Sequence, residues 1–221
     1  DLKAAVRGAM TGIFYNKGEV CAAGSRLLVQ RSVYKEVCAA VAEQAAKFVP
    51  SAPIPGDPRS ARMGPVASKA QFDSVLNLIQ AGKDEGANCL TGGSAHDNGT
   101  GKGYFIQPTV FNDVDNAMQI AQQEIFGPVL CIIPFEDEAE AIAIANDCNY
   151  GLAAAVWTQD VARALRVVRR VDAGTVWVNA YNLYDPSLPF GGFKASGYGR
   201  DLGEAALAGY TESKSVWINL G

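Results

Sequence analysis

The feature that most constrains the fold is an alternation of short β-branched runs with longer amphipathic stretches. The β-branched and apolar runs predict strands at Leu27–Gln30, Val129–Pro134, Ala153–Trp157, Thr175–Asn179 and Ser213–Leu220. Strands that alternate with helices along a chain are typical of parallel sheets. We therefore expect an α/β fold, with a mostly parallel twisted sheet and flanking helices. The last strand has no helix after it, so we expect it to pair with another edge, for example in another subunit.

The stretches between the strands have helical periodicity or the composition of loops. Helices are predicted at Tyr34–Phe48, from Lys69 to about Lys83, at Asp137–Asn146 and at Asp160–Val171. Val37, Val41, Ala45 and Phe48 of the first should face a core, and Val161, Leu165 and Val168 share one face of the last. Pro50–Pro65 and Gly92–Gly103 are rich in turn-forming residues and should be surface connections.

Composition excludes several classes of partner. The chain has 221 residues, of which 48% are apolar and 19% charged, which is ordinary for one well-packed α/β domain. A net charge of -4 argues against nucleic acid or an anionic membrane as the main partner. Apolar runs such as Val129–Phe135 are too short to cross a bilayer. We expect neither a nucleic-acid nor a membrane partner.

The cysteines and the start of the chain suggest where it acts and how it was made. The five cysteines are an odd number, widely spaced and without a CxxC pair. Unpaired thiols suit a reducing compartment, so a cytoplasmic location is expected. The chain begins with Asp1 instead of Met, so we expect it to be a fragment.

Cys21 lies in the most informative segment, Asn16-Lys17-Gly18-Glu19-Val20-Cys21-Ala22-Ala23-Gly24-Ser25-Arg26. A thiol nucleophile needs partial exposure and close approach of the substrate, and small residues and glycines around it allow both. Most lone cysteines, however, are small buried apolar residues. From its spacing alone, that second interpretation is favoured.

The complete string resembles the cysteine motif of the aldehyde dehydrogenase superfamily, N-x-G-x-x-C-x-A-G-S-R. Further strings match the family in order and spacing: Glu124-Ile125-Phe126-Gly127-Pro128-Val129, Val176-Trp177-Val178-Asn179, Pro189-Phe190-Gly191-Gly192-Phe193-Lys194 with Ser196-Gly197, and Tyr210-Thr211-Glu212 with Lys214. The resemblance covers essentially the whole chain. It implies an aldehyde dehydrogenase catalytic domain in residues 1–210 and a terminal strand of the oligomerisation region in 211–221, with the coenzyme-binding domain absent.

The resemblance assigns Cys21 as the catalytic nucleophile of an oxidoreductase. Its thiolate would attack an aldehyde to give a thiohemiacetal, then a thioester after hydride transfer to NAD or NADP, and water would release a carboxylic acid. The backbone N–H of Cys21 would be one oxyanion donor. The family's general-base Glu and oxyanion Asn have no counterpart among these residues, so we expect the isolated chain to be inactive.

The resemblance also implies the coenzyme and aldehyde contacts. Glu124 and Phe126, with Gln71, correspond to positions beside the nicotinamide ribose and ring. An exposed helix residue is an equally good interpretation of Gln71. The aldehyde pocket would be lined by Tyr15, Val20, Ala22, Tyr184 and Phe190. Three aromatic side chains there favour an apolar or aromatic aldehyde over a charged one.

Other residues leave alternatives open. Arg26, Asn179 and Lys194 match motif positions, but structural hydrogen bonding explains them adequately, and Asp201 stands where relatives often have Glu. One alternative is a cysteine hydrolase, which would require His96 beside Cys21. The other is a non-catalytic fragment that serves only as an assembly surface. A single histidine makes a His-rich metal site implausible, and a homodimer or homotetramer is expected for the full-length protein.

Overall fold

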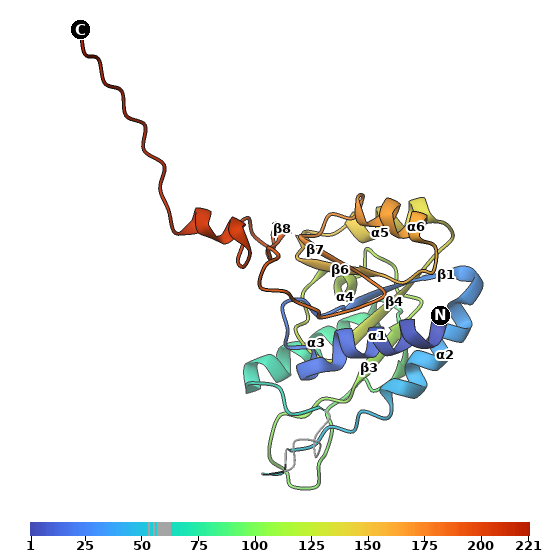
Figure 1. Ribbon diagram of the computed structural model, residues 1–221. Coiled ribbons are helices and arrows are strands. Elements are labelled where there is room, and N and C mark those ends of the chain that lie inside the picture. Colours follow the sequence, from blue (N-terminus) through green and yellow to red (C-terminus); the bar gives the residue numbers. More distant parts are fainter. Residues whose placement is uncertain (53, 55, 57–62) are drawn as a thin grey trace.

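A four-stranded sheet lies at the centre of the fold in the computed structural model, which describes residues 1–52, 54, 56 and 63–221 (Figure 1). The strand order is β1-β4-β3-β2, with β1 at Arg26–Gln30, β2 at Asn88–Thr91, β3 at Thr109–Asn112 and β4 at Val129–Phe135. β4 runs parallel to β1 and β3, and β2 is an antiparallel edge strand. The predicted mostly parallel α/β fold is confirmed. Part of the predicted connection Pro50–Pro65 lies outside the described residues.

Alternate residues of β4 enter two separate cores. Leu130 and Ile132 pack with α1 (Leu2–Phe14) and α2 (Tyr34–Ala45) on one face of the sheet. Cys131 and Ile133 pack on the other face, with α3 (Lys69–Asp84) and α4 (Gln119–Gln122). A strand buried on both faces reads as a continuous apolar run, which explains why β4 could be predicted.

A thinner layer follows the central sheet in the sequence. β6 (Ala153–Val156) and β7 (Thr175–Val178) form a parallel pair, and β5 (Tyr150–Gly151) pairs antiparallel with β8 (Phe193–Lys194). Two helices, α5 (Glu138–Asn146) and α6 (Val161–Val168), lie above β6 and β7 in Figure 1. Short 3-10 helices occur at Tyr15–Gly18, Arg31–Val33 and Glu204–Gly209.

A cavity of about 770 Å³ separates the central sheet from the thinner layer. β1 and β6 both line it along their lengths, and α1 and α5 contribute further lining residues. Because β1 ends the strand order of its sheet and β6 has only β7 as a partner, each has an unpaired edge within the described chain. No helix in the part of the chain that the structure describes is both long and apolar enough to span a membrane.

Several boundaries differ from those predicted. Helix α1 was not predicted, although Asp1 caps it by accepting a hydrogen bond from the Ala4 N–H at 3.0 Å. The predicted helix Asp160–Val171 is shorter, since Asp160 is the N-cap of α6 and its side chain accepts from the Arg163 N–H. On α6 the apolar side chains of Val161 and Leu165 are exposed, and Ala164 is the buried residue.

The terminal residues form no strand within the chain. Residues 211–221 extend away from the body of the molecule (Figure 1), and their side chains are exposed. The predicted strand Ser213–Leu220 is therefore not formed by this chain alone. Pairing requires a second edge, and this segment lies against none of the strand edges of the described chain.

Candidate active site

Cys21 lies in the loop between α1 and β1, and its side chain is exposed. The backbone on both sides of it is held: the Ala23 N–H donates to the Val20 carbonyl at 2.9 Å, and the Gly24 N–H donates to the Gly12 carbonyl at 3.0 Å. Ala22 is only 3% exposed. A fixed backbone with a free thiol is what a nucleophile requires.

The turn before Cys21 depends on left-handed backbone conformations. Asn16 and Lys17 have φ of 47° and 53°, and Gly18 has φ of 78°. A Cβ on Gly18 would lie 2.1 Å from the Gly127 carbonyl oxygen. Glycine is therefore required at position 18, both because φ is positive there and because the backbone of Gly127 approaches closely. This contact brings the cysteine loop against the segment that contains Glu124 and Phe126.

Glu124 and Phe126 are held at the surface by a turn. The side-chain amide of Gln71 donates to the carbonyls of Ile125 and Phe126, at 3.1 and 2.7 Å. Ile125 is buried, whereas Glu124 is exposed and the Phe126 side chain is 39% exposed with φ of 52°. Both donor hydrogens of the Gln71 amide serve the turn. Gln71 thus fixes the turn, and the residues left free to meet a ligand are Glu124 and Phe126.

The cavity between the central sheet and the thinner layer joins these two segments. Its lining includes Val20, Cys21 and Ala22 as well as Gln123 to Gly127. Cys21, Glu124 and Phe126 therefore line one common space. Sequence reasoning grouped these residues only through a resemblance, and the structure brings them together.

An aromatic cluster lies beside the thiol. Tyr184 packs edge-on against both Phe190 and Trp177, with ring centroids 5.4 and 5.6 Å apart. Partial burial and then the nearby Cys21 thiol raise the pKa of the Tyr184 phenol. Two of the predicted pocket residues, Tyr184 and Phe190, are thus in contact with each other, but neither is among the residues that line the cavity with Cys21. Tyr15 is 62% exposed and makes no ring contact among the described residues.

Tyr181 is a site residue that sequence reasoning missed. Its hydroxyl donates to the Ala22 carbonyl at 2.8 Å, and its ring packs on Trp177 with centroids 4.9 Å apart. A Cβ on Gly24 would lie 3.0 Å from the Tyr181 hydroxyl oxygen. Burial raises the pKa of this phenol far above its usual range, so it stays a hydrogen-bond donor. Nothing in the local sequence indicates a contact across 159 residues.

The remaining candidates do not join the site. His96 lies in the loop bridged to residue 106, and no hydrogen bond links it to Cys21 in the described part of the chain. The described residues contain no cluster of three or more His, Cys, Asp or Glu side chains suited to a metal. Cys38 and Cys131 are buried, and burial raises the pKa of both thiols, that of Cys131 to about 12. Among the five thiols, Cys21 is the exposed one.

Fold and site together define a class: an α/β protein with an exposed cysteine and an exposed glutamate on one cavity, and with an aromatic cluster nearby. The chain belongs to the aldehyde dehydrogenase family, since the model of the "Aldehyde dehydrogenase family" matches residues 1–216. It is 48% identical over 220 residues to "Putative aldehyde dehydrogenase DhaS" of Bacillus subtilis, covering all of this chain and 43% of that protein. It is 47% identical over 221 residues to "Betaine aldehyde dehydrogenase 1" of Rhizobium meliloti, covering 45% of that protein.

Solved structures show the same fold. An aldehyde dehydrogenase from Bacillus cereus in complex with NAD+ superposes with a TM-score of 0.93 at 47% identity, covering all of this chain and 44% of that one. The P. syringae indole-3-acetaldehyde dehydrogenase AldA, in complex with NAD+ and IAA, gives the same TM-score, identity and coverage. The chain therefore spans less than half the length of these relatives.

Proposed function

We propose that this chain is the cysteine-bearing catalytic part of an enzyme that oxidises aldehydes to carboxylic acids with NAD or NADP. The observation that supports this most directly is the exposed Cys21 thiol, on a fixed backbone, in the cavity shared with Glu124 and Phe126. In this proposal residues 1–210 are the catalytic domain, and the coenzyme-binding domain belongs to the rest of the polypeptide. A hydrolase mechanism lacks support, because His96 is not hydrogen-bonded to the thiol among the described residues.

Cys21 would carry the covalent chemistry. Its thiolate forms a C–S bond with the aldehyde carbon, and the carbonyl electrons move onto oxygen to give a thiohemiacetal. The backbone N–H of Cys21 would donate to that oxyanion. Loss of hydride from the carbon restores the C=O bond and leaves a thioester on Cys21. Attack by water then breaks the C–S bond and releases the acid and the thiol.

The residues around the thiol fit a nicotinamide coenzyme. When bound, NAD or NADP accepts the hydride. The exposed carboxylate of Glu124 offers two acceptor oxygens to a pair of ribose hydroxyls, and the exposed ring of Phe126 offers an apolar face to a planar ring. Gln71 would position both by fixing the turn between them.

The isolated chain should be inactive, because hydrolysis of the thioester needs a general base and the oxyanion needs a second donor. Both groups would come from the rest of the polypeptide. For the full-length protein we also propose a homodimer or homotetramer, to which the exposed apolar side chains of Val216, Trp217, Ile218 and Leu220 would contribute.

The aromatic wall favours an apolar or aromatic aldehyde. Tyr184 and Phe190 form a ring pair near the segment that contains Cys21, and the aldehyde dehydrogenase from P. syringae in the comparison acts on indole-3-acetaldehyde by its name. The matched betaine aldehyde dehydrogenases are named for a cationic substrate. Rings also attract cations through their faces, so the two substrate classes have to be compared directly.

The test is an assay of NAD and NADP reduction by the full-length protein with an aliphatic, an aromatic and a quaternary-ammonium aldehyde. We expect turnover that Cys21→Ser lowers by at least about a thousandfold, the usual cost of losing a catalytic nucleophile. The matched control is Cys89→Ser, a half-buried thiol outside the cavity lining. Equal activity of the Cys21→Ser variant would refute the proposal, and sustained turnover by the isolated chain would refute the need for the rest of the polypeptide.

A further inference from the structure

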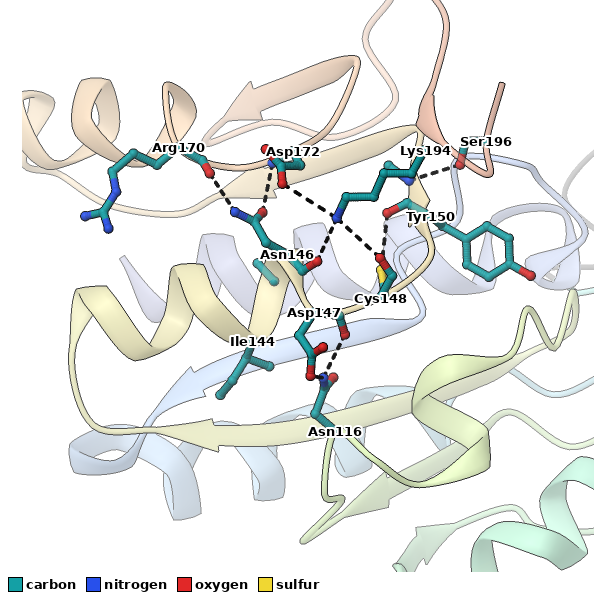
Figure 2. A network of polar contacts seen from close by, with 12 residues as sticks. Asn116, Ile144, Asn146, Asp147, Cys148, Tyr150, Arg170, Asp172, Lys194 and Ser196 are labelled. Carbon is teal, nitrogen blue, oxygen red and sulfur yellow. Dashed lines mark hydrogen bonds and ion pairs between the residues drawn. The ribbon is translucent and has the colours of Figure 1, made fainter. Parts of the chain in front are cut away.

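Two cationic side chains from distant parts of the sequence end on the same short stretch of backbone. This stretch is the carboxyl end of α5, where the last carbonyls have no partner within the helix. Arg26 donates from Nη1 to the Ile144 carbonyl at 3.0 Å and from Nη2 to the Ala145 carbonyl at 2.9 Å. Lys194 donates from Nζ to the Asn146 carbonyl at 2.6 Å and to the Cys148 carbonyl at 3.3 Å (Figure 2). Cations at this end of a helix are stabilised by its dipole.

Polar side chains fix the Arg26 side of this stretch. Asn116, which is 9% exposed, accepts from Arg26 Nη1 at 2.7 Å. Its own amide donates to the carbonyl and the carboxylate of Asp147, at 2.8 and 2.9 Å (Figure 2). Arg26 is therefore held in one orientation between Asn116 and the end of α5.

The Lys194 side is fixed in the same way. Lys194 Nζ lies 3.7 Å from the Asp172 carboxylate. Asn146 accepts from the Asp172 N–H at 2.8 Å and donates to the Arg170 carbonyl at 2.7 Å (Figure 2). We call the group of Arg26, Asn116, Asn146, Asp172 and Lys194 the α5 end network.

The α5 end network connects the segment that contains Cys21 with the segment that contains Phe190. Arg26 begins β1, five positions after Cys21. Lys194 lies in β8, four positions after Phe190, with φ of 54°. The backbone of the Lys194 segment is also joined to the stretch after α5, since the Ala195 N–H donates to the Asn149 carbonyl at 2.9 Å. One end of the network is thus attached to the nucleophile loop and the other to the aromatic wall.

From this geometry we infer that Arg26 and Lys194 are positioning residues, which together fix the aromatic wall of Tyr184 and Phe190 against Cys21. The inference rests on the proposed function for its catalytic consequence. Neither cation lies in contact with the thiol among the described residues, so both act through backbone. Small displacements of a catalytic group lower the rate of the chemical step more than they weaken coenzyme binding.

The variants for the test are Lys194→Met, which removes the charge and the donors, and Lys194→Arg, which keeps both. Lys47→Met is the matched control, because Lys47 also pairs with a carboxylate, that of Glu43 at 2.7 Å, but in the exposed turn after α2. Each variant of the full-length protein is assayed for kcat and for KM towards the coenzyme. Native alkylation by iodoacetamide and by a bulky fluorescein iodoacetamide is mapped to each cysteine by mass spectrometry.

We expect Lys194→Met to lower kcat about tenfold and to leave the coenzyme KM within about twofold. The ratio of bulky to small alkylation at Cys21 should rise, because the aromatic rings are no longer held near the thiol. Buried Cys38 and Cys131 should stay protected. Lys194→Arg should restore most of kcat, and Lys47→Met should behave as wild type.

Two results would overturn the inference. One is a Lys194→Met variant with wild-type kcat and a wild-type alkylation ratio at Cys21. The other is a parallel rise in alkylation at Cys21, Cys38 and Cys131, which would show general loosening of the fold. If the wild-type protein oxidises no aldehyde, the proposed function fails, and the alkylation ratio alone then decides whether Lys194 positions the wall.

Discussion

The chain before Asp147 and the chain after it differ in how much core each has. Every buried residue of the two core clusters lies between Val6 and Ile133, on the two faces of the central sheet. In residues 147–221 the buried residues are Gly151, Ala164, Trp177 and Gly192. In Figure 1 the second part lies over the first as a thin layer that ends in an extended tail. The first part is stabilised by its own packing, whereas the second is held mainly by polar contacts such as the α5 end network.

This difference has a consequence for the site, because the site is made from both parts. The loop that contains Cys21 belongs to the well-packed part, and Tyr184 and Phe190 belong to the thin layer. The position of the aromatic rings relative to Cys21 therefore depends on the contacts between the two parts. The predictions below test the difference, from the largest expected effect to the smallest.

The largest effect is expected from a matched pair of truncations. Ile132→Ala removes a fully buried side chain of β4 and should lower the free energy of unfolding by about 2–5 kcal/mol. Leu165→Ala removes the same number of carbons from α6, where the side chain is 51% exposed, and should cost less than about 1 kcal/mol. Urea denaturation of the full-length protein measures both. A similar loss of unfolding free energy in the two variants would show that another part of the polypeptide covers α6. The two parts of the chain would then not differ in how well they are packed.

The second effect tests the contact between the loop that contains Cys21 and the turn that contains Glu124 and Phe126. Gly18→Ala should cost about 1–3 kcal/mol, because φ is 78° and the new Cβ would lie 2.1 Å from the Gly127 carbonyl oxygen. Gly99→Ala is the control: φ is 75°, but a Cβ there meets nothing within 4 Å. Because φ is similar at the two positions, the difference between the two losses of unfolding free energy measures the cost of the contact with Gly127. Equal costs would mean that the loop can move away from residue 127.

The third effect tests a direct bond between the two parts. Tyr181→Phe removes the hydroxyl that donates to the Ala22 carbonyl, and it should cost about 1 kcal/mol. The native alkylation rate at Cys21 should change as well, since Ala22 is the next residue. Tyr198→Phe, at a 99% exposed position, should change neither quantity. If the stability falls but the alkylation of Cys21 does not, the bond holds the layer in place without positioning the thiol.

The same difference explains which parts of the fold could be predicted. β4 and the helix Lys69–Asp84 were predicted because their burial produces a regular local pattern. The extent of α6 and the absence of a paired strand in residues 211–221 depend on contacts outside each segment. A local pattern that predicts an apolar face cannot tell whether anything covers it.

The candidate site divides in a similar way. Cys21, Glu124 and Phe126 belong to strings whose resemblance to a family could be recognised, and they line one cavity. The contacts of Gln71 with the turn and of Tyr181 with Ala22 span 54 to 159 residues, and no local pattern encodes them. The substrate specificity and the coenzyme preference stay predictions, because they depend on residues that face the ligand from more than one part of the protein.

The smallest effect is expected at the surface where α5 of the first part meets α6 of the second. Arg166, by hydrogen bonding and charge, and then the charges of Arg163 and Arg170 lower the pKa of the partly exposed Glu138 below its ordinary value. A carboxyl group whose pKa is lowered by folding stabilises the folded state above its unfolded pKa, and the contribution is lost as the pH falls through the folded pKa. Glu138→Gln should therefore lower the melting temperature slightly at pH 7, and the difference from wild type should disappear on acidification below about pH 4. It should also shrink in high salt, since the pair is exposed. A difference that persists in acid would show that Glu138 acts through packing between α5 and α6, and the thin layer would then have more core than its exposed surfaces indicate.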